Sequence, residues 1–301
     1  MCGHVMEPIR RRSCMSVPGS SEKMLAKAPT RGADEIIIDL EDAVATSVKD
    51  AARETVLAAL AEPQYHGVIT AVRVNAPRTP WCHQDIAALG ALAAGRPASI
   101  IVPKVESAGD LAFVDRLLDG VEAAAAVGEP MRVQALIETA AGVDRLSEIA
   151  AASPRLDSLI LGYADLSASL GRARGSSAGG ELDSWRAIQD AVLVAARAND
   201  RAAIDGPYLG VAVDEGFTAA AQRARDMGFD GKWAIHPAQV PALNELFTPS
   251  ADEVDHARAV IDALEQAERD GGQGAVALDG QMLDEAVRVA ALRVLARSAG
   301  T

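Results

Sequence analysis

Aromatic residues make up only 3% of this 301-residue chain. Alanine, valine, leucine and isoleucine must therefore build the core, since apolar residues of all kinds reach 49%. Cysteine is scarce too: Cys2, Cys14 and Cys82 are odd in number and widely spaced, which argues against a disulfide framework and a zinc site. Only five histidines occur and none are clustered, so a histidine-rich metal site is not expected.

Basic residues are also outnumbered by acidic ones, 29 to 42. The formal net charge of −13 disfavours nucleic acid or an anionic membrane as a partner. It does not exclude an anionic small molecule, because a local arginine and lysine pocket or a bound metal can override the overall field. No apolar run is long enough to span a membrane, and the opening MCGHVMEPIRRRS lacks a signal-peptide core, so we expect a cytoplasmic protein.

The sequence does contain a regular alternation of short apolar runs and longer helical patterns. The runs that predict strands are 13–17, 35–40, 68–74, 99–104, 132–138, 156–162, 202–205 and 231–236, and a helical pattern follows each. Apolar strands separated by helices predict a parallel sheet covered on both faces. Eight such units within about 240 residues favour a closed (β/α)8 TIM barrel over an open doubly wound sheet. No Gly-rich dinucleotide fingerprint follows the first strand, which also disfavours the open sheet.

The barrel domain is predicted to occupy residues 1–250, and residues 251–301 are predicted to form a helical extension. Within the extension, 251–270 has a long amphipathic pattern and 282–297 has apolar residues at helical spacing. Between them, DGGQGAVALDGQ (270–281) is predicted to be a Gly-rich linker. A helix after such a linker can act as a lid and pack on a neighbouring subunit.

Ionisable residues stand where nearly every predicted strand ends. In a barrel, these positions line the mouth in which active sites are built. The stretch GADEIIIDLEDAV is an example, because Asp39, Glu41 and Asp42 close an otherwise apolar run. The other strand ends carry Arg73 with Asn75, Lys104 with Glu106, Glu138, Asp165, Asp205 and His236. We interpret this ring as one polar site at the mouth.

Glu138 and Asp165 end two adjacent predicted strands. Their carboxylates would form half of a ligand shell for a hard divalent cation such as Mg²⁺, with waters and substrate oxygens completing it. However, the motifs ETAAG and DLSAS also look like helix starts, in which these acids would be caps. From spacing alone, the two interpretations are equally supported.

The basic residues of the ring have more than one interpretation. Arg73 is expected to meet Glu41, either in a buried ion pair or as a guanidinium that holds a carboxylate or an enolate oxygen. Lys104 has the same ambiguity and could form a Schiff base, which would make the protein a metal-independent aldolase. His236 and Trp233 are expected to be structural, with Trp233 in the core.

An ordered set of blocks resembles the citrate lyase β-subunit family, also called HpcH/HpaI aldolase/citrate lyase. The blocks are RRSCMSVPGSSEKMLAKA, ADEIIIDLEDAV, AVRVN, IIVPKVES, ALIETAAG, SPRLDSLILGYADLSASLG, AIDGPY and GFDGKWAIHPAQV, and NELFTPS and GQMLDEAV extend the match towards the C-terminus. Within the family, they look most like the malyl-CoA, β-methylmalyl-CoA and citramalyl-CoA lyase branch. Single blocks would be weak evidence, whereas the ordered set is highly specific.

The resemblance implies a role for each matching position. Glu138 and Asp165 would bind Mg²⁺, with Mn²⁺ as the alternative metal. Arg73 would face the carbonyl and enolate oxygens, and Glu41 would belong to the carboxylate network around it. Asp284, in GQMLDEAV, would be the catalytic carboxylate delivered by a neighbouring subunit's lid. A lid acting between subunits implies a homotrimer or a hexamer.

Further positions follow from the same resemblance. The backbone around Gly162 and Ala164 would hold the keto-acid carboxylate, and Arg12 and Lys27 would lie near the phosphates of coenzyme A. The residues expected to support this set from behind are Asp39, Asp42, Lys104 and Asp205.

The reaction implied is a reversible, Mg²⁺-dependent Claisen-type cleavage of a malyl-CoA-type thioester to acetyl-CoA or propionyl-CoA plus glyoxylate. The alternatives are a citramalyl-CoA lyase that yields pyruvate, a citrate lyase subunit that acts on citryl-acyl-carrier protein, and a malyl-CoA thioesterase. The loop 171–183 is short and rich in Gly and Ser, whereas typical bacterial malyl-CoA lyases have a longer insertion there. It therefore leaves the acyl substrate open.

Overall fold

The computed structural model describes residues 9–172, 182–271, 274–278 and 280–298. The chain divides into two compact units, Met1–Asn244 and Glu245–Thr301, and each is described by itself. Most of the predicted loop 171–183 lies outside the described residues.

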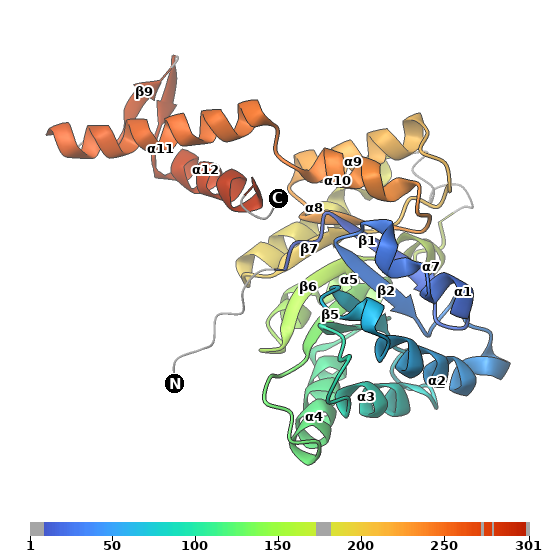
Figure 1. The fold of residues 1–301 in the computed structure, drawn as a ribbon. Coiled ribbons are helices and arrows are strands. Elements are labelled where there is room, and N and C mark those ends of the chain that lie inside the picture. Colours follow the sequence, from blue (N-terminus) through green and yellow to red (C-terminus); the bar gives the residue numbers. More distant parts are fainter. Residues whose placement is uncertain (1–8, 173–181, 272–273, 279, 299–301) are drawn as a thin grey trace. The chain divides into compact units, whose positions relative to one another are not determined.

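Eight parallel strands of the first unit close into a barrel in chain order, which confirms the predicted (β/α)8 fold (Figure 1). The strands are β1 (Ser13–Pro18), β2 (Glu35–Asp39), β3 (Thr70–Arg73), β4 (Ser99–Val102), β5 (Arg132–Ile137), β6 (Leu156–Leu161), β7 (Ala202–Asp205) and β8 (Gly231–Ala234). The strand β1 pairs with β2 on one side and with β8 on the other, so the described barrel has no open edge.

Helices follow the strands and surround the barrel (Figure 1). They are α1 (Glu22–Leu25), α2 (Lys49–Leu60), α3 (Cys82–Gly90), α4 (Ala108–Ala124), α5 (Ala140–Asp144), α6 (Leu146–Ala150), α7 (Tyr163–Ser169), α8 (Leu182–Ala198), α9 (Glu215–Met227) and α10 (Gln239–Phe247). The helical pattern predicted after the first strand consists of α1 and a 3-10 turn, Ala28–Arg31, which has proline in its first turn. The helix α5 follows β5 and α7 follows β6, and the first turn of α7 contains Asp165.

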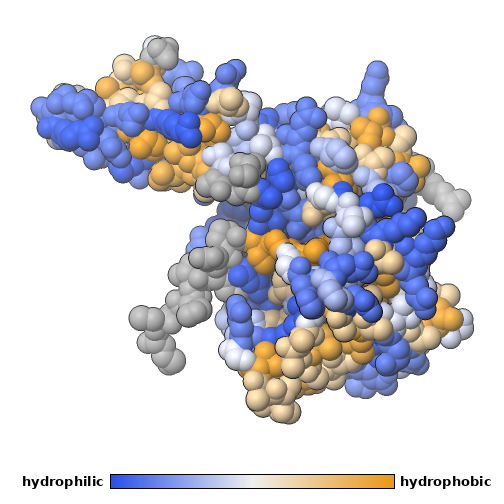
Figure 2. Space-filling view, in the orientation of Figure 1, coloured by the Kyte–Doolittle hydropathy of each residue, from blue (hydrophilic) through white to orange (hydrophobic). Residues whose placement is uncertain are grey.

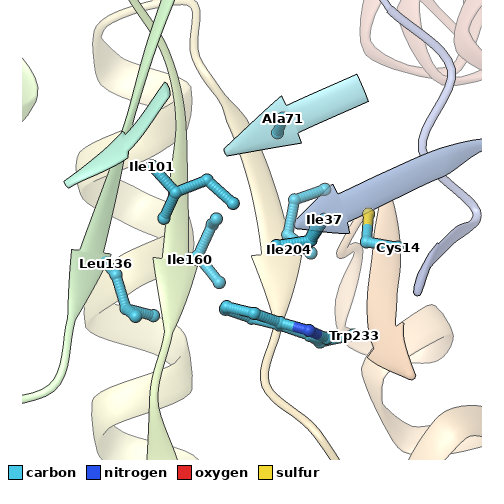
Figure 3. Packing of buried hydrophobic residues seen from close by; sticks show 8 residues of the cluster. All are labelled: Cys14, Ile37, Ala71, Ile101, Leu136, Ile160, Ile204 and Trp233. Carbon is cyan, nitrogen blue, oxygen red and sulfur yellow. The ribbon is translucent and has the colours of Figure 1, made fainter. Parts of the chain in front are cut away.

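The barrel interior is layered, because residues two positions apart on a strand share a face. One residue from each strand forms the middle, apolar layer, and Figure 3 shows their side chains pointing toward one another. This layer consists of Cys14, Ile37, Ala71, Ile101, Leu136, Ile160, Ile204 and Trp233. Two positions later in the chain come Asp39, Arg73 and Glu138 at the carboxyl ends of β2, β3 and β5.

A polar layer closes the opposite end of the barrel. Arg11 donates to Glu35 over 2.8 Å and to Asp157 over 2.9 Å, where Arg11 and Glu35 are buried and Asp157 is partly buried. Gln134 donates to Glu35 over 3.0 Å and to Ser99 over 2.7 Å. These groups bond mainly to one another at the amino ends of the strands, whereas active sites of such barrels are built at the carboxyl ends.

The second unit consists of α11 (Ala251–Gly271), β9 (Val276–Leu278), β10 (Gln281–Leu283) and α12 (Glu285–Ser298). Its helices pack through a small apolar core, to which Val260, Leu264 and Ala291 belong. The described part of the segment predicted to be a Gly-rich linker, 270–281, instead contains β9 and the first residue of β10, its antiparallel partner. Gly280 has a φ of +80° immediately before β10, so glycine here supports a turn and not a flexible connection.

Within the described ranges, no helix is both long and apolar enough to cross a membrane. Figure 2 shows hydrophilic residues over much of the face in view, with apolar residues in smaller groups, among them a group over α3 and α4. Phe113 of α4 is 45% exposed. Exposed apolar residues of this kind are ordinary on folded proteins.

Candidate functional site

Asp39 and Arg73 form a two-pronged ion pair at the barrel mouth. They are register partners on β2 and β3, so the strand pairing itself brings them together. Arg73 Nε donates to Asp39 Oδ1 over 2.8 Å, and Nη2 donates to Oδ2 over 2.5 Å. Asp39 also accepts the backbone N–H of Glu41 at 2.7 Å. One carboxylate therefore fixes both the guanidinium and the turn that presents Glu41.

Arg73 makes two further contacts that hold it in place. Its Nη1 lies 3.1 Å from Glu41 Oε2, and its guanidinium carbon lies 5.4 Å from the centroid of the Trp233 ring. Burial alone would lower the pKa of Arg73, but the hydrogen bond with Asp39 and the charges of Asp39, Glu41 and Glu138 outweigh it and raise that pKa. The site thus contains a fixed, permanently positive group.

Lys104 lies among four carboxylates. Its Nζ forms an ion pair with Glu41 at 2.5 Å, and the side chain is 33% exposed. The other three acids lie within 4 Å of Nζ: Asp165 at 3.4 Å, Asp42 at 3.6 Å and Glu138 at 3.9 Å. Burial lowers the pKa of Lys104, but the hydrogen bond with Glu41 and the charges of Glu138, Glu41 and Asp165 raise it above its ordinary value. A protonated lysine is a poor nucleophile, which disfavours a Schiff-base aldolase.

The backbone of Lys104 is also unusual. Its φ is +51°, in the left-handed region that residues with a side chain seldom adopt. In this conformation, its N–H donates to Glu138 Oε1 over 3.0 Å. Such strain, on the order of 1 kcal/mol or more, persists where surrounding structure imposes it, and it clusters at functional sites.

Glu138 follows β5 and is buried, with 3% of its side chain exposed. The N-cap of α5 is Thr139, whose Oγ1 accepts the N–H of Gly142 at 3.1 Å. The interpretation of Glu138 as a helix cap is therefore wrong, because its neighbour does the capping. Burial and the charge of Glu41 raise the pKa of Glu138 to about 8, despite the opposing effects of Lys104 and Arg73.

Gly162 brings the end of β6 against Glu138. A Cβ at this glycine would lie 2.7 Å from both Cβ and Oε2 of Glu138, so only glycine fits without a shift. Gly162 is the N-cap of α7, and Asp165 lies in its first turn with 38% of its side chain exposed. Asp165 is consequently not the cap, and its carboxylate shares Lys104 with Glu138.

The charges of this site do not balance. Its carboxylates are Asp39, Glu41, Asp42, Glu138 and Asp165. Against these five acids stand Arg73, Lys104 and Lys49, whose ammonium donates to the carbonyls of Leu40 and Glu41, and with all groups ionised this leaves a formal charge of −2. Among the described residues, no group of three or more His, Cys, Asp or Glu can hold a metal ion. Two hard oxygen donors in a cluster with excess negative charge nevertheless fit a Mg²⁺ ion that takes its remaining ligands from water and substrate.

The other residues predicted for the site are placed differently. Arg12 precedes β1, at the amino end of the barrel, where Nε and Nη2 donate to Asp34 over 2.8 Å. This placement, across the barrel from the mouth, gives no support to a phosphate-binding role for Arg12 near the site. Lys27 and Ala164 are exposed. Asp284 belongs to the second unit, where Oδ1 accepts the N–H of Ala286 at 3.0 Å and caps α12.

Two features were missed in the sequence. Trp233, expected only in the core, also contacts Arg73. Asp205, expected in a supporting role, is joined by Lys232, a lysine within the buried strand β8. A lysine in an otherwise apolar strand, GKWA, was the signal that could have indicated this pair.

A protein-family model described as HpcH/HpaI aldolase/citrate lyase matches residues 12–237, which include all eight barrel strands. The chain belongs to the HpcH/HpaI aldolase/citrate lyase family. Aldolases and citrate lyases cleave carbon–carbon bonds, so membership confirms the predicted enzyme class, a carbon–carbon lyase. It also confirms the family resemblance.

Two curated relatives of this HpcH/HpaI family member are similar along nearly their full length. The L-malyl-CoA/β-methylmalyl-CoA lyase of Cereibacter sphaeroides is 36% identical over 291 residues, covering 92% of this chain and 91% of the relative. The (3S)-malyl-CoA thioesterase of C. sphaeroides is 38% identical over 287 residues, covering 95% of this chain and 94% of the relative.

Solved structures agree with the fold. The CitE protein of Mycobacterium tuberculosis, in complex with magnesium, acetoacetate and coenzyme A, has a TM-score of 0.75 and 33% identity, covering 95% of this chain and 97% of that one. A citrate lyase of Burkholderia xenovorans has a TM-score of 0.86 and 23% identity, covering 99% of this chain and 94% of that one. At this identity, the similarity supports the fold alone.

Proposed function

We propose that this protein is a Mg²⁺-dependent acyl-CoA lyase that cleaves a malyl-CoA-type thioester to acetyl-CoA or propionyl-CoA plus glyoxylate. The observation that carries the proposal is the cluster at the mouth, in which Lys104 Nζ lies 3.9 Å from Glu138 and 3.4 Å from Asp165, with Arg73 fixed beside them. The relative named malyl-CoA/β-methylmalyl-CoA lyase and the CitE complex with magnesium and coenzyme A support the choice of substrate and metal.

The metal would be held by Glu138 and Asp165. When bound, Mg²⁺ would supply Lewis-acid polarisation of the oxygens on the substrate's carboxylate and α-hydroxyl carbon. Lys104 would neutralise the remaining acids, Glu41 above all, so that the pocket accepts an anionic substrate. Asp39 holds Nε and Nη2 of Arg73 from behind, and Nη1, which lies 3.1 Å from Glu41, would be the group that faces a thioester oxygen.

Cleavage breaks the bond between the hydroxyl-bearing carbon and the carbon next to the thioester. A carboxylate, for which we propose Asp284 of a neighbouring subunit, would take the hydroxyl proton. The bonding electrons pass to the thioester and form an enolate, whose oxygen Arg73 would stabilise. Protonation of the enolate carbon then gives the acyl-CoA product, and the keto acid leaves. In the reverse direction, the same base would remove the α-proton of acetyl-CoA.

The second candidate is a malyl-CoA thioesterase, favoured by the 38% identical relative of that name. Water would then attack the thioester carbonyl, and the products would be malate and free coenzyme A. The two reactions need the same ligands for substrate and metal, so they are separated by their products.

The test is an assay of purified protein with Mg²⁺ on malyl-CoA, β-methylmalyl-CoA and citramalyl-CoA, each with and without EDTA. We expect metal-dependent release of acetyl-CoA or propionyl-CoA together with a keto acid. Pyruvate would identify a citramalyl-CoA lyase, and free coenzyme A without keto acid would identify the thioesterase. No reaction with any of the three would contradict the proposal and favour a subunit that acts on citryl-acyl-carrier protein.

A further inference from the structure

A second buried polar cluster lies beside the mouth, between the barrel and its helices. Its members are Tyr163, Gln189, Asp205 and Lys232, from α7, α8, β7 and β8, and none is more than 7% exposed. Asp205 Oδ2 accepts from Lys232 Nζ over 2.5 Å, and Lys232 also donates to the carbonyl of Gly206 over 2.7 Å. The cluster thus ties β7 and β8 together through a buried ion pair.

The hydroxyl of Tyr163 is the point at which this cluster reaches α7. It donates to Asp205 Oδ1 and accepts from Gln189 Nε2 at 2.7 Å. Two neighbours enclose the ring: Trp185 packs edge-on with centroids 5.0 Å apart, and a Cβ at Gly206 would lie 2.8 Å from Cδ2. These contacts restrict the Tyr163 ring to one position.

A buried ion pair such as Asp205–Lys232 adds little net stability, because desolvation offsets the attraction between the charges. Its hydrogen bonds are directional, however, and they define where a partner hydroxyl must lie. Gly206, which follows Asp205, supplies both an acceptor for Lys232 and the space for the ring. The arrangement accordingly restricts Tyr163 from two sides at once.

Tyr163 is the first residue of α7, and Asp165 lies two residues later in the same turn. Asp165 has few restraints of its own, since its side chain is 38% exposed and that of Lys104, its ion-pair partner, is 33% exposed. A helix of seven residues is too short to be stable by itself, so its placement depends on anchoring contacts. The direction of the Asp165 carboxylate consequently depends on where Tyr163 fixes the start of α7.

We propose that Tyr163 is a positioning residue for the metal site: by bonding its hydroxyl to Asp205 and Gln189, it anchors the first turn of α7 and orients Asp165 toward Mg²⁺. This inference rests on the proposed function, because it takes Asp165 as a ligand. Tyr163 itself touches neither metal nor substrate in this role.

The test replaces one hydroxyl in full-length protein, with Tyr163→Phe compared against Tyr65→Phe. Tyr65 is a matched control, since it is 5% exposed and its hydroxyl also makes a buried hydrogen bond, to the carbonyl of Leu25 at 2.9 Å. Mg²⁺ affinity is measured by titration calorimetry without substrate, so the readout does not require turnover. We expect Tyr163→Phe to weaken Mg²⁺ binding about tenfold and Tyr65→Phe to leave it unchanged. In the cleavage assay, Tyr163→Phe should need more Mg²⁺ for half-maximal rate while saturating Mg²⁺ restores most of kcat.

Equal Mg²⁺ affinity in the two variants would overturn the inference and leave the lyase proposal standing. Wild-type protein that binds Mg²⁺ but cleaves no acyl-CoA would overturn the proposed function, and the two affinities would still decide the role of Tyr163. Wild-type protein that binds no Mg²⁺ overturns both. Should Tyr163→Phe fail to fold, Gln189→Met removes the other hydrogen bond to the same hydroxyl, and unchanged Mg²⁺ affinity in that variant would overturn the inference.

Discussion

The guanidinium carbon of Arg73 lies 5.4 Å from the centroid of the Trp233 ring, at the boundary between the apolar layer and the mouth. Asp39 holds the same guanidinium through two hydrogen bonds. The arginine is thus supported by a carboxylate at one side and by an aromatic ring at another, and both supports come from strands of the barrel. Its position is set before any substrate arrives.

We predict that Trp233→Leu lowers kcat for cleavage more than it raises KM. A cation–π contact in a largely buried site is worth about 1–2 kcal/mol. If its loss affects only the alignment of Arg73 in the transition state, the rate should fall roughly tenfold. Trp233→Phe, which keeps a ring, should retain most of the activity. Steady-state kinetics of the two variants check this, and equal losses would show that volume, not the ring, is what matters.

We expect Lys104→Met to change the response of the protein to metal. Removal of the ammonium leaves Glu41 and its neighbours without their shared cation, so the metal-free variant should unfold at a lower temperature than the wild type. Added Mg²⁺ should then raise the melting temperature of the variant by more than it raises that of the wild type. A thermal-shift series with and without Mg²⁺ measures this, and identical shifts would contradict the idea that Lys104 and the metal neutralise the same acids.

The packing of Gly162 against Glu138 gives a third prediction. Gly162→Ala would place a methyl group 2.7 Å from Glu138 Oε2, so the carboxylate must move and Mg²⁺ affinity should fall about tenfold. Overpacking should also cost about 1–3 kcal/mol of unfolding free energy. Gly120→Ala in α4 is the matched control, because nothing lies within 4 Å of the added methyl. Calorimetric titration with Mg²⁺ measures the affinity of both variants. Equal affinities in Gly162→Ala and Gly120→Ala would refute the prediction.

Much of the barrel could be predicted from the sequence because its signals are local. Apolar strands that end on charged residues give the eight units and the identity of the mouth, and Asp39 and Arg73 were both recognised there. Which acid faces which base depends on strand register, which no local pattern contains. Arg73 therefore meets Asp39 as its principal partner, with the expected Glu41 as a second contact.

The features that were not predicted from the sequence share one physical origin. Glu138 and Thr139 are both plausible caps in ETAAG, and only the fold decides that Thr139 takes this role. The hydrogen bonds from Tyr163 to Asp205 and from Lys232 to Asp205 join residues 42 and 27 positions apart. In the second unit, glycine was interpreted as flexibility, although Gly280 supports a turn between paired strands. Each miss concerns a contact that the chain makes with a distant part of itself or a backbone angle fixed by such contacts.

The proposed role of Asp284 gives a final prediction that also tests the oligomer. Asp284→Asn should lower kcat by about 10²–10⁴, because asparagine cannot take the hydroxyl proton. The helix should remain intact, since asparagine caps as well as aspartate and can still accept the N–H of Ala286. Circular dichroism and thermal unfolding control for folding. A variant with full activity would show that Asp284 is only a cap.

If the residue acts between subunits, mixing and co-refolding Asp284→Asn with Glu138→Gln should restore activity, because some sites then combine an intact Glu138 with an intact Asp284 from a neighbour. No recovery in mixtures shown to exchange subunits would place the catalytic carboxylate within the same chain.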